Sequence, residues 1–212
     1  MARPRRGRSG RLLRALMPED GEVAGLPALM LLTEARRGAR VSAGGELVAL
    51  DEQDRAAWDA ALIAEGHRLV RERPATGTPP GRYQILAAIN AVHTSARHVR
   101  DTDWPQVVAL YDQLVRLAPS PIVALNRAVA VAELDGPEVA LAIVDRLDGD
   151  LAGYHAYHAY HGTRADLLRQ LGRGREAGAA YDRAIELAGT TPAWRASSAT
   201  PPPSCRAGCA ST

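Results

Sequence analysis

The sequence predicts an all-α protein: a tetratricopeptide-like stack of helix pairs between disordered termini. Two observations carry this prediction. Apolar residues recur with the period of a helix over most of the chain, and no convincing hairpin pattern appears between the turn clusters. Three similar strings, YDQLVRL, VDRLDGD and YDRAIEL, begin at Tyr111, Val144 and Tyr181. Their spacings of 33 and 37 residues bracket the period of about 34 that is typical of tetratricopeptide repeats.

The elements before the repeats are predicted from caps and breakers. A first helix is expected over about 23–37, where Gly38 ends it. Residues 41–50 contain a Gly-Gly turn and are expected to form an extended connector. Asp51 is interpreted as the cap of a second helix over about 52–73.

A linker rich in Pro and Gly follows at 74–81, and no helix is expected to cross it. The helical period resumes over 83–92 and breaks again at 100–103. A further helix is predicted to begin near Trp104 and to end before Pro119.

The repeats that follow are predicted to pack small residues against large ones. An Ala at a helix crossing lets two helices approach, and Tyr or Leu fills the neighbouring space. We therefore expect the tightest packing around Tyr111, Ala128, Leu141, Ala165 and Tyr181. A bare apolar face on the last unit is expected either to fray or to bring two copies together.

Four segments are expected along the chain. They are a disordered basic arm at 1–10, an N-terminal helical part at 11–100, the repeats at 101–188 and a disordered tail at 189–212. The tail is rich in Pro, Ser, Thr and Ala and has too little apolar surface to order itself. Six Arg fall in the first fourteen residues. They predict weak, nonspecific nucleic-acid binding or simply a solvated terminus, because no aromatic residues for base stacking lie among them.

Composition excludes several classes of function. All 26 basic residues are Arg, so a phosphate-binding loop with Lys and a Schiff-base Lys are both excluded. No apolar run of signal-peptide or membrane-spanning length is present, which predicts a cytoplasmic protein without membrane contact. Cys205 and Cys209 are expected to remain thiols there, and a zinc site at this pair is not expected without a second ligand pair.

Two motifs suggest chemistry, and each has a simpler interpretation. His155, His158 and His161 could face one side of a helix and hold a metal, but they belong to tandem copies of the tripeptide Tyr-His-Ala. Residues 172–177 fit the dinucleotide pattern G-x-G-x-x-A, but a helix-forming run precedes them where a strand is required. No Ser, His and Asp combination has the context of a nucleophile elbow. We therefore expect no metal, no cofactor and no enzyme activity, with an enzyme that uses the His cluster as the remaining alternative.

Several long strings resemble one protein family. They include GRLLRALMPEDGEVAGLPALMLLTEARR, LDEQDRAAWD, YQILAAINAVH, DTDWPQVVALYDQLVRLAPSPIVALNRAVAVAELDGPEVAL and HGTRADLLRQLGR. These strings resemble the helical C-terminal extension of a subgroup of extracytoplasmic-function (ECF) sigma factors, which are sigma-70 family subunits of bacterial RNA polymerase. The resemblance runs from about Arg11 to Leu187.

The resemblance implies a tetratricopeptide-like module that regulates a sigma factor through intramolecular or partner contacts. The expected partners are the core regions of the sigma factor or RNA polymerase. The family's regions that grip core polymerase and read promoter elements would precede Arg11, so a truncated chain that does not read promoters is expected. Trp104, Asn126, Arg127 and Arg164 are the candidate partner-binding residues. A free-standing tetratricopeptide adaptor is the alternative.

Overall fold

The computed structural model describes residues 21–188, except 43, 46, 47, 49, 51, 73–78 and 152–156. This part of the chain is all-α and contains no sheet, as predicted. The predicted basic arm and the predicted tail lie outside the described residues. The elements are α2 (Gly21–Ala35), η1 (Arg37–Ala39), η2 (Arg55–Ala57), α3 (Ala60–Arg71), α4 (Arg82–Ser95), η3 (Val99–Asp101), α5 (Trp104–Leu117), α6 (Pro121–Asp135), α7 (Pro137–Asp145), α8 (Asp148–Leu151), α9 (Tyr157–Gln170) and α10 (Gly174–Ala188).

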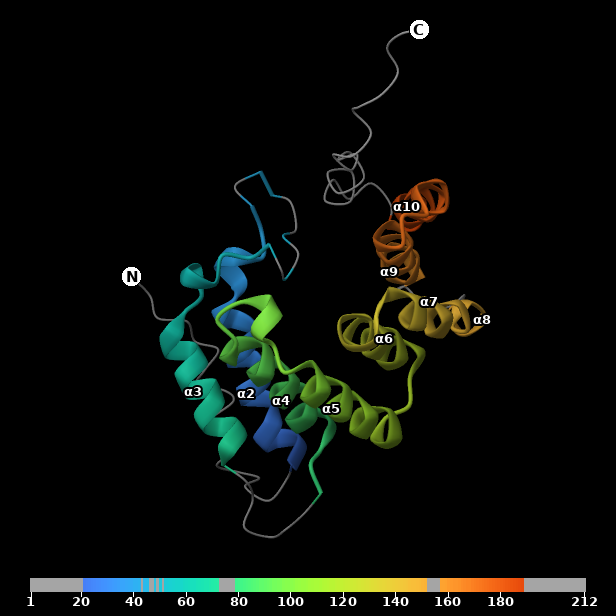
Figure 1. Ribbon diagram of the computed structural model, residues 1–212. Helices are drawn as coiled ribbons and strands as arrows, with labels where there is room; N and C mark the ends of the chain where they lie inside the picture. The colour runs from blue at the N-terminus through green and yellow to red at the C-terminus, as the bar shows by residue number, and fades with distance from the viewer. Residues whose placement is uncertain are drawn as a thin grey trace, which may run out of the picture.

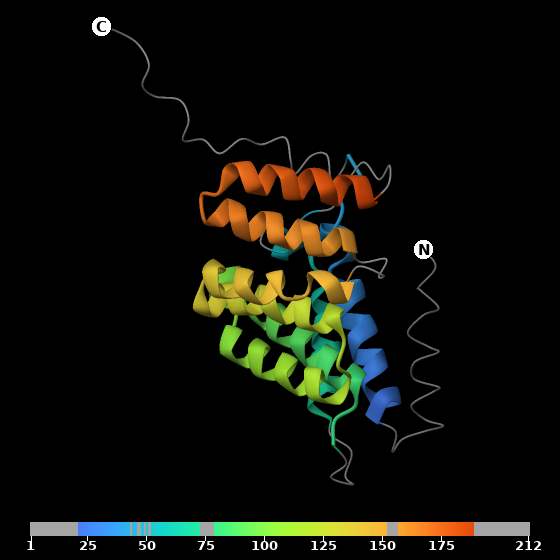
Figure 2. The same ribbon diagram turned by 90° about the vertical axis from the view of Figure 1, so that its right-hand side faces the viewer.

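The helices pack in pairs, and each pair packs on the next (Figure 1). Helix α2 packs against α3 and α4, and α4 packs on α5. From there α5 packs on α6, α6 on α7, α7 on α9 and α9 on α10. Figure 2 shows the result as successive layers, with α10 at one end of the stack. Among the described helices, none is long and apolar enough to span a membrane.

Helix α2 packs against α4 through the carboxylate of Glu22 and through a close backbone contact at Gly25. Glu22 on α2 accepts hydrogen bonds from the backbone N–H groups of Arg82 and Tyr83, at 2.6 and 2.8 Å. These are N–H groups of the first turn of α4, which have no acceptor within the helix. A Cβ atom on Gly25 would lie only 2.2 Å from the backbone nitrogen of Gln84. The absence of a side chain at Gly25 therefore sets how closely α2 and α4 pack.

The expected second helix begins later than its predicted start at residue 52. The side chain of Asp54 caps the short turn η2, and Asp59 caps α3 by accepting from the N–H groups of Ala61 and Leu62. Between the two caps the backbone of Trp58 is extended, so its indole leaves the helical path and is buried with only 7% of its surface exposed. Asp51 lies outside the described residues. The prediction of one continuous helix from 52 was wrong because Asp54 and Asp59 can each cap a helix, and the sequence alone does not show where the helix begins.

The core from α4 to α10 contains two apolar clusters that share α6. One cluster lies between α4, α5 and α6 and includes Val123 and Ala130 of α6. The other lies between α6, α7, α8, α9 and α10 and includes Leu125 and Ala128 of α6. A helix that is covered on two sides needs apolar residues around most of its circumference, which explains why the sequence of α6 is so uniformly apolar.

Two glycines lie in the turns that separate helices of the second half. Gly136 separates α6 from α7 with φ 95°, and Gly172 follows α9 with φ 72°. Both values lie in the region that glycine adopts without a steric penalty. A helix and not a strand precedes Gly172, so the G-x-G-x-x-A string spans the turn from α9 into α10 and lacks the strand that the dinucleotide pattern requires. Proline opens α6 and α7, where the missing N–H costs no hydrogen bond.

The residues predicted to pack most tightly divide into two groups. Ala128 and Ala165 are fully buried, and Leu141 is 5% exposed. Tyr111 and Tyr181 are only partly buried and pack against the edges of the two clusters. The small residues are therefore at the helix crossings as predicted, whereas the tyrosines lie closer to the surface than expected.

Candidate functional site

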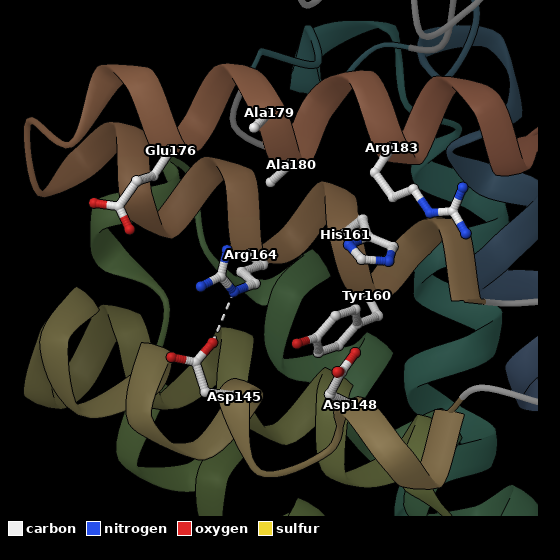
Figure 3. Close-up of a pocket in the computed structure, with 9 residues that line it drawn as sticks. All are labelled: Asp145, Asp148, Tyr160, His161, Arg164, Glu176, Ala179, Ala180 and Arg183. Carbon is white, nitrogen blue, oxygen red and sulfur yellow. Dashed lines mark hydrogen bonds and ion pairs between the residues drawn. The ribbon is translucent and has the colours of Figure 1, made fainter.

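A groove of about 470 Å³ opens between the layer of α7 and α8 and the layer of α9 and α10 (Figure 3). We call it the α9 groove. Its lining contains acidic, basic and aromatic side chains but no Ser, Thr or Cys among the described residues. The lining residues are Asp145, Asp148, Tyr160, His161, Arg164, Glu176, Ala179, Ala180 and Arg183.

Arg164, one of the predicted partner-binding residues, crosses this groove. Its Nε donates to a carboxylate oxygen of Asp145 on α7 at 2.7 Å. Burial alone lowers the pKa of Arg164, but the hydrogen bond and charge of Asp145, together with Tyr160 and Glu176, outweigh it and raise the pKa. The guanidinium is therefore permanently charged and held in one place, although Asp145 remains half exposed to a ligand in the groove.

His161 faces the same groove from α9, beside Arg183 of α10 (Figure 3). Its ring lies edge-on to Tyr160 at a centroid distance of 4.9 Å. Burial lowers the pKa of His161, and the positive charges of Arg183 and Arg164 lower it further, while Asp148 opposes them. His161 is thus neutral at physiological pH. The groove presents its positive charge through arginine alone.

The structure brings no metal site together around the histidines that it describes. Within the described residues, no group of three or more His, Cys, Asp and Glu side chains is placed to hold an ion. His155 lies outside them, so the predicted spacing of three histidines is described only at His158 and His161. Cys205 and Cys209 also lie outside the described residues.

Arg127, a second predicted partner-binding residue, makes an equivalent contact one layer away. Its Nε donates to Asp112 of α5 at 2.6 Å, and both side chains are partly exposed. Asp112 and Asp145 are the second residues of the similar strings YDQL and VDRL. The structure therefore joins each predicted arginine to a repeated aspartate on the preceding layer. The repeated strings contained this signal, but neither aspartate was predicted as a partner of an arginine.

The other two predicted residues lie elsewhere. Asn126 is exposed on α6, next to Arg127 in the sequence. Trp104 opens α5, is partly buried and meets His93 of α4 edge-on at a centroid distance of 5.4 Å. The four predicted residues are thus distributed over separate contacts and do not line one common groove.

Trp104 belongs to a cluster that was not predicted from the sequence, the Trp58 cluster, formed by Arg36, Arg55, Trp58, His93 and Trp104. The guanidinium carbons of Arg55 and Arg36 lie 4.6 and 5.3 Å from the centre of the Trp58 ring. Such cation–π contacts add to the stability of a buried indole. The strings LDEQDRAAWD, YQILAAINAVH and DTDW each supply at least one member of this cluster.

Arg55 also closes the end of α4. Its Nη1 donates to the backbone oxygens of His93 and Ala96, both at 2.7 Å. A positive group at the C-terminus of a helix compensates the exposed carbonyls there. Burial, with the charges of Arg36 and Arg55, lowers the pKa of His93 to about 4. The cluster therefore holds a neutral histidine between two permanent cations.

Four buried polar atoms at this cluster and the adjoining loop make no hydrogen bond within the described part of the chain. They are Nη2 of Arg55, Nε1 of Trp58, Nδ1 of His93 and Oγ1 of Thr102. A second cavity, of about 430 Å³, lies nearby between α3, α4 and α5 and is lined by His67, Arg71, Ala96, Asp101 and Asp103 among others. Trp58 lines neither this cavity nor the α9 groove. The side chains of the Trp58 cluster thus pack α4, α5 and the segment around η2 against one another.

The comparisons with known proteins identify relatives without an assigned function. Residues 8–74 match the model of a family described as "Family of unknown function (DUF6596)". A protein of Rhizobium meliloti (strain 1021), described as uncharacterized, is 48% identical to this chain over 181 residues, which is 85% of the chain. The chain spans 42% of the length of that relative. No solved structure matches the chain significantly.

Proposed function

We propose that the chain is the regulatory protein-interaction domain of an ECF-type RNA polymerase sigma factor. The observation that carries the interaction role is the α9 groove, which is open and lined by charges of both signs. Stacks of helix pairs commonly bind partners through such surfaces. The assignment to a sigma factor rests on the resemblance of the long strings between Arg11 and Leu187.

The charges of the groove favour recognition of a polar protein segment. Arg164 and Arg183 offer cations, while Asp145, Asp148 and Glu176 offer carboxylates. Complementary charges of both signs fix the register of a bound segment more than they add to its affinity. A partner with alternating acidic and basic residues fits this lining.

The length of the Rhizobium meliloti relative supports the same proposal. This chain matches 42% of that protein, so more than half of the relative is available for other regions. In the proposed arrangement, the unmatched part of the relative contains the regions that grip core polymerase and read promoters. The domain represented by this chain would then act on those regions, or on polymerase itself, by direct contact.

A binding experiment tests the proposal. The unmatched part of the relative and core RNA polymerase are each titrated with the purified chain by isothermal calorimetry. We expect saturable binding to at least one of them. Ala179→Glu, which fills the α9 groove without removing an ion pair, should weaken that binding. Ala142→Glu changes an exposed helical alanine on α7 outside the lining and should leave binding unchanged.

The outcomes separate the two leading interpretations. Binding that Ala179→Glu weakens and Ala142→Glu does not would support the groove as the contact surface. If neither the unmatched part nor polymerase binds, the sigma-factor assignment fails, and the free-standing adaptor becomes the better interpretation. Equal effects of the two substitutions would place the contact outside the groove.

A further inference from the structure

A repeated pattern of ion pairs points to a binding surface on α10. In two successive layers, an aspartate of one helix pairs with an arginine of the helix that covers it. Asp112 on α5 pairs with Arg127 at 2.6 Å, and Asp145 on α7 pairs with Arg164 at 2.7 Å. In each covering helix, the residues four before and three after the arginine are apolar and buried: Val123 and Ala130 around Arg127, and Tyr160 and Leu167 around Arg164. Val123 and Ala130 belong to the cluster that includes α5, so the arginine and its two apolar neighbours form one contact face between layers.

Helix α10 carries the third copy of the aspartate. Asp182 follows Tyr181 in the string YDRAIEL, as Asp112 follows Tyr111 in YDQLVRL. Asp182 is exposed and makes no ion pair within the described residues. Figure 2 shows α10 at the end of the stack, and no described helix lies beyond it. The position that an arginine occupies in the other two layers therefore has no described occupant here.

The surroundings of Asp182 share one of two apolar positions with the surface that receives the arginine on α5. Residues four before and three after an aspartate share its face of a helix. On α5 these residues are Val108 and Val115, and both pack into the apolar cluster with α6. On α10 they are Gly178 and Ile185. A Cβ on Gly178 would meet nothing within 4 Å, so this strip leaves room for a large side chain from a bound helix.

We propose that the strip of Gly178, Asp182 and Ile185 binds an α-helix of a partner protein that carries an arginine with apolar residues four positions before and three positions after it. The arginine of that helix pairs with Asp182, and its two apolar neighbours lie against the strip. This proposal rests on the proposed function only in treating the chain as an interaction domain. It does not require the partner to be a sigma factor or polymerase.

A peptide copy of α6 provides the probe. A synthetic peptide of residues 119–136 contains Arg127 with Val123 and Ala130 at the required positions. We expect it to shift the backbone NMR signals of α10, with the largest shifts around Asp182. Asp182→Arg should weaken this binding about three- to tenfold, because one exposed ion pair is lost and a like-charge contact replaces it. The Arg127→Glu version of the peptide should bind poorly to the unaltered chain and better to the Asp182→Arg chain.

Control variants distinguish binding at this strip from a general effect of charge or of unfolding. Glu52→Arg makes the same change of net charge at an exposed position far from α10 in the sequence and should not alter the affinity. Thermal unfolding shows whether the Asp182→Arg chain remains folded. Binding of the Arg127→Glu peptide to this chain is a second check, because a misfolded chain would bind neither peptide.

Three results would overturn the proposal. They are absence of peptide binding at millimolar concentration, shifts confined to α5 and α7, and dimerisation of the chain through α10 without peptide. The peptide result does not depend on whether polymerase or the unmatched part of the relative binds the α9 groove. Failure of this proposal and failure of the sigma-factor role are therefore distinguishable.

Discussion

Replacement of Gly25 by alanine perturbs the contact between α2 and α4. The new Cβ would lie 2.2 Å from the backbone nitrogen of Gln84 and 2.5 Å from the backbone carbon of Tyr83. Ordinary contacts of this kind begin at 3.4 Å. Backbone atoms of a helix cannot turn aside as a side chain can, so α2 and α4 must move apart. The movement would also strain the two hydrogen bonds by which Glu22 caps α4.

The size of the effect follows from two opposing contributions. Overpacking costs typically 1–3 kcal/mol, and contact with rigid backbone places this case near the upper value of about 3 kcal/mol. The higher helix propensity of alanine relative to glycine stabilises the folded protein by about 1 kcal/mol. The net loss is therefore about 2 kcal/mol. For a protein of this size, the loss corresponds to a decrease in Tm of about 4–8 °C.

Gly178→Ala is the matched control. Gly178 is also within a helix, but its added Cβ would meet nothing within 4 Å. Only the helix-propensity gain remains, so this variant should be more stable by about 0.5–1 kcal/mol. Urea and thermal unfolding of the two variants, followed by circular dichroism, measure the difference. If Gly25→Ala is as stable as the unaltered protein, the close packing of α2 on α4 is not as described.

Three further predictions concern the core and the Trp58 cluster. Ala128→Leu and Ala165→Leu should each lower stability by roughly 1–3 kcal/mol, because both sites are fully buried at helix crossings; unchanged urea midpoints for both would contradict this. The pKa of His93 falls from 6.5 to about 4 on folding, so the unfolded chain binds the extra proton and stability should decrease as the pH falls from about 6.5 towards 4. His93→Gln should flatten that part of a stability profile against pH, and an identical profile would refute the assignment. Arg55→Ala removes two hydrogen bonds to the end of α4 and should cost about 1.5–3 kcal/mol, whereas the exposed Arg97→Ala should be neutral; equal effects would argue against the cap.

Local signals in the sequence account for the helix boundaries of the second half. A helix was expected from near Trp104 to before Pro119, and α5 ends at Leu117. Pro121 and Pro137 open α6 and α7, and Gly136 precedes α7 with a positive φ. These features act within a few residues, so they can be interpreted without knowledge of the tertiary structure. The start of α3 was mispredicted because Trp58 has the spacing of a helical core residue and capping residues were available on both sides of it. In the structure Trp58 is extended between the caps Asp54 and Asp59, and the guanidinium groups of Arg36 and Arg55 pack against its ring.

The candidate site was predictable only in part. Arg127 and Arg164 were singled out from the sequence, and their partners Asp112 and Asp145 could have been found by aligning the similar strings. The remaining lining of the α9 groove could not, because it depends on how α9 and α10 lie across α7 and α8. His161, for example, follows a Tyr just as His158 does. Only the tertiary packing places it beside Arg183.

Transcription in a purified system tests the sigma-factor role most directly. Core RNA polymerase is combined with the Rhizobium meliloti relative, with the relative after deletion of the part matched by this chain, or with this chain alone. Promoter-specific transcripts are then measured. We predict initiation by the relative, altered initiation after the deletion, and none by this chain alone. Absence of initiation by the relative, or initiation by this chain alone, would contradict the account.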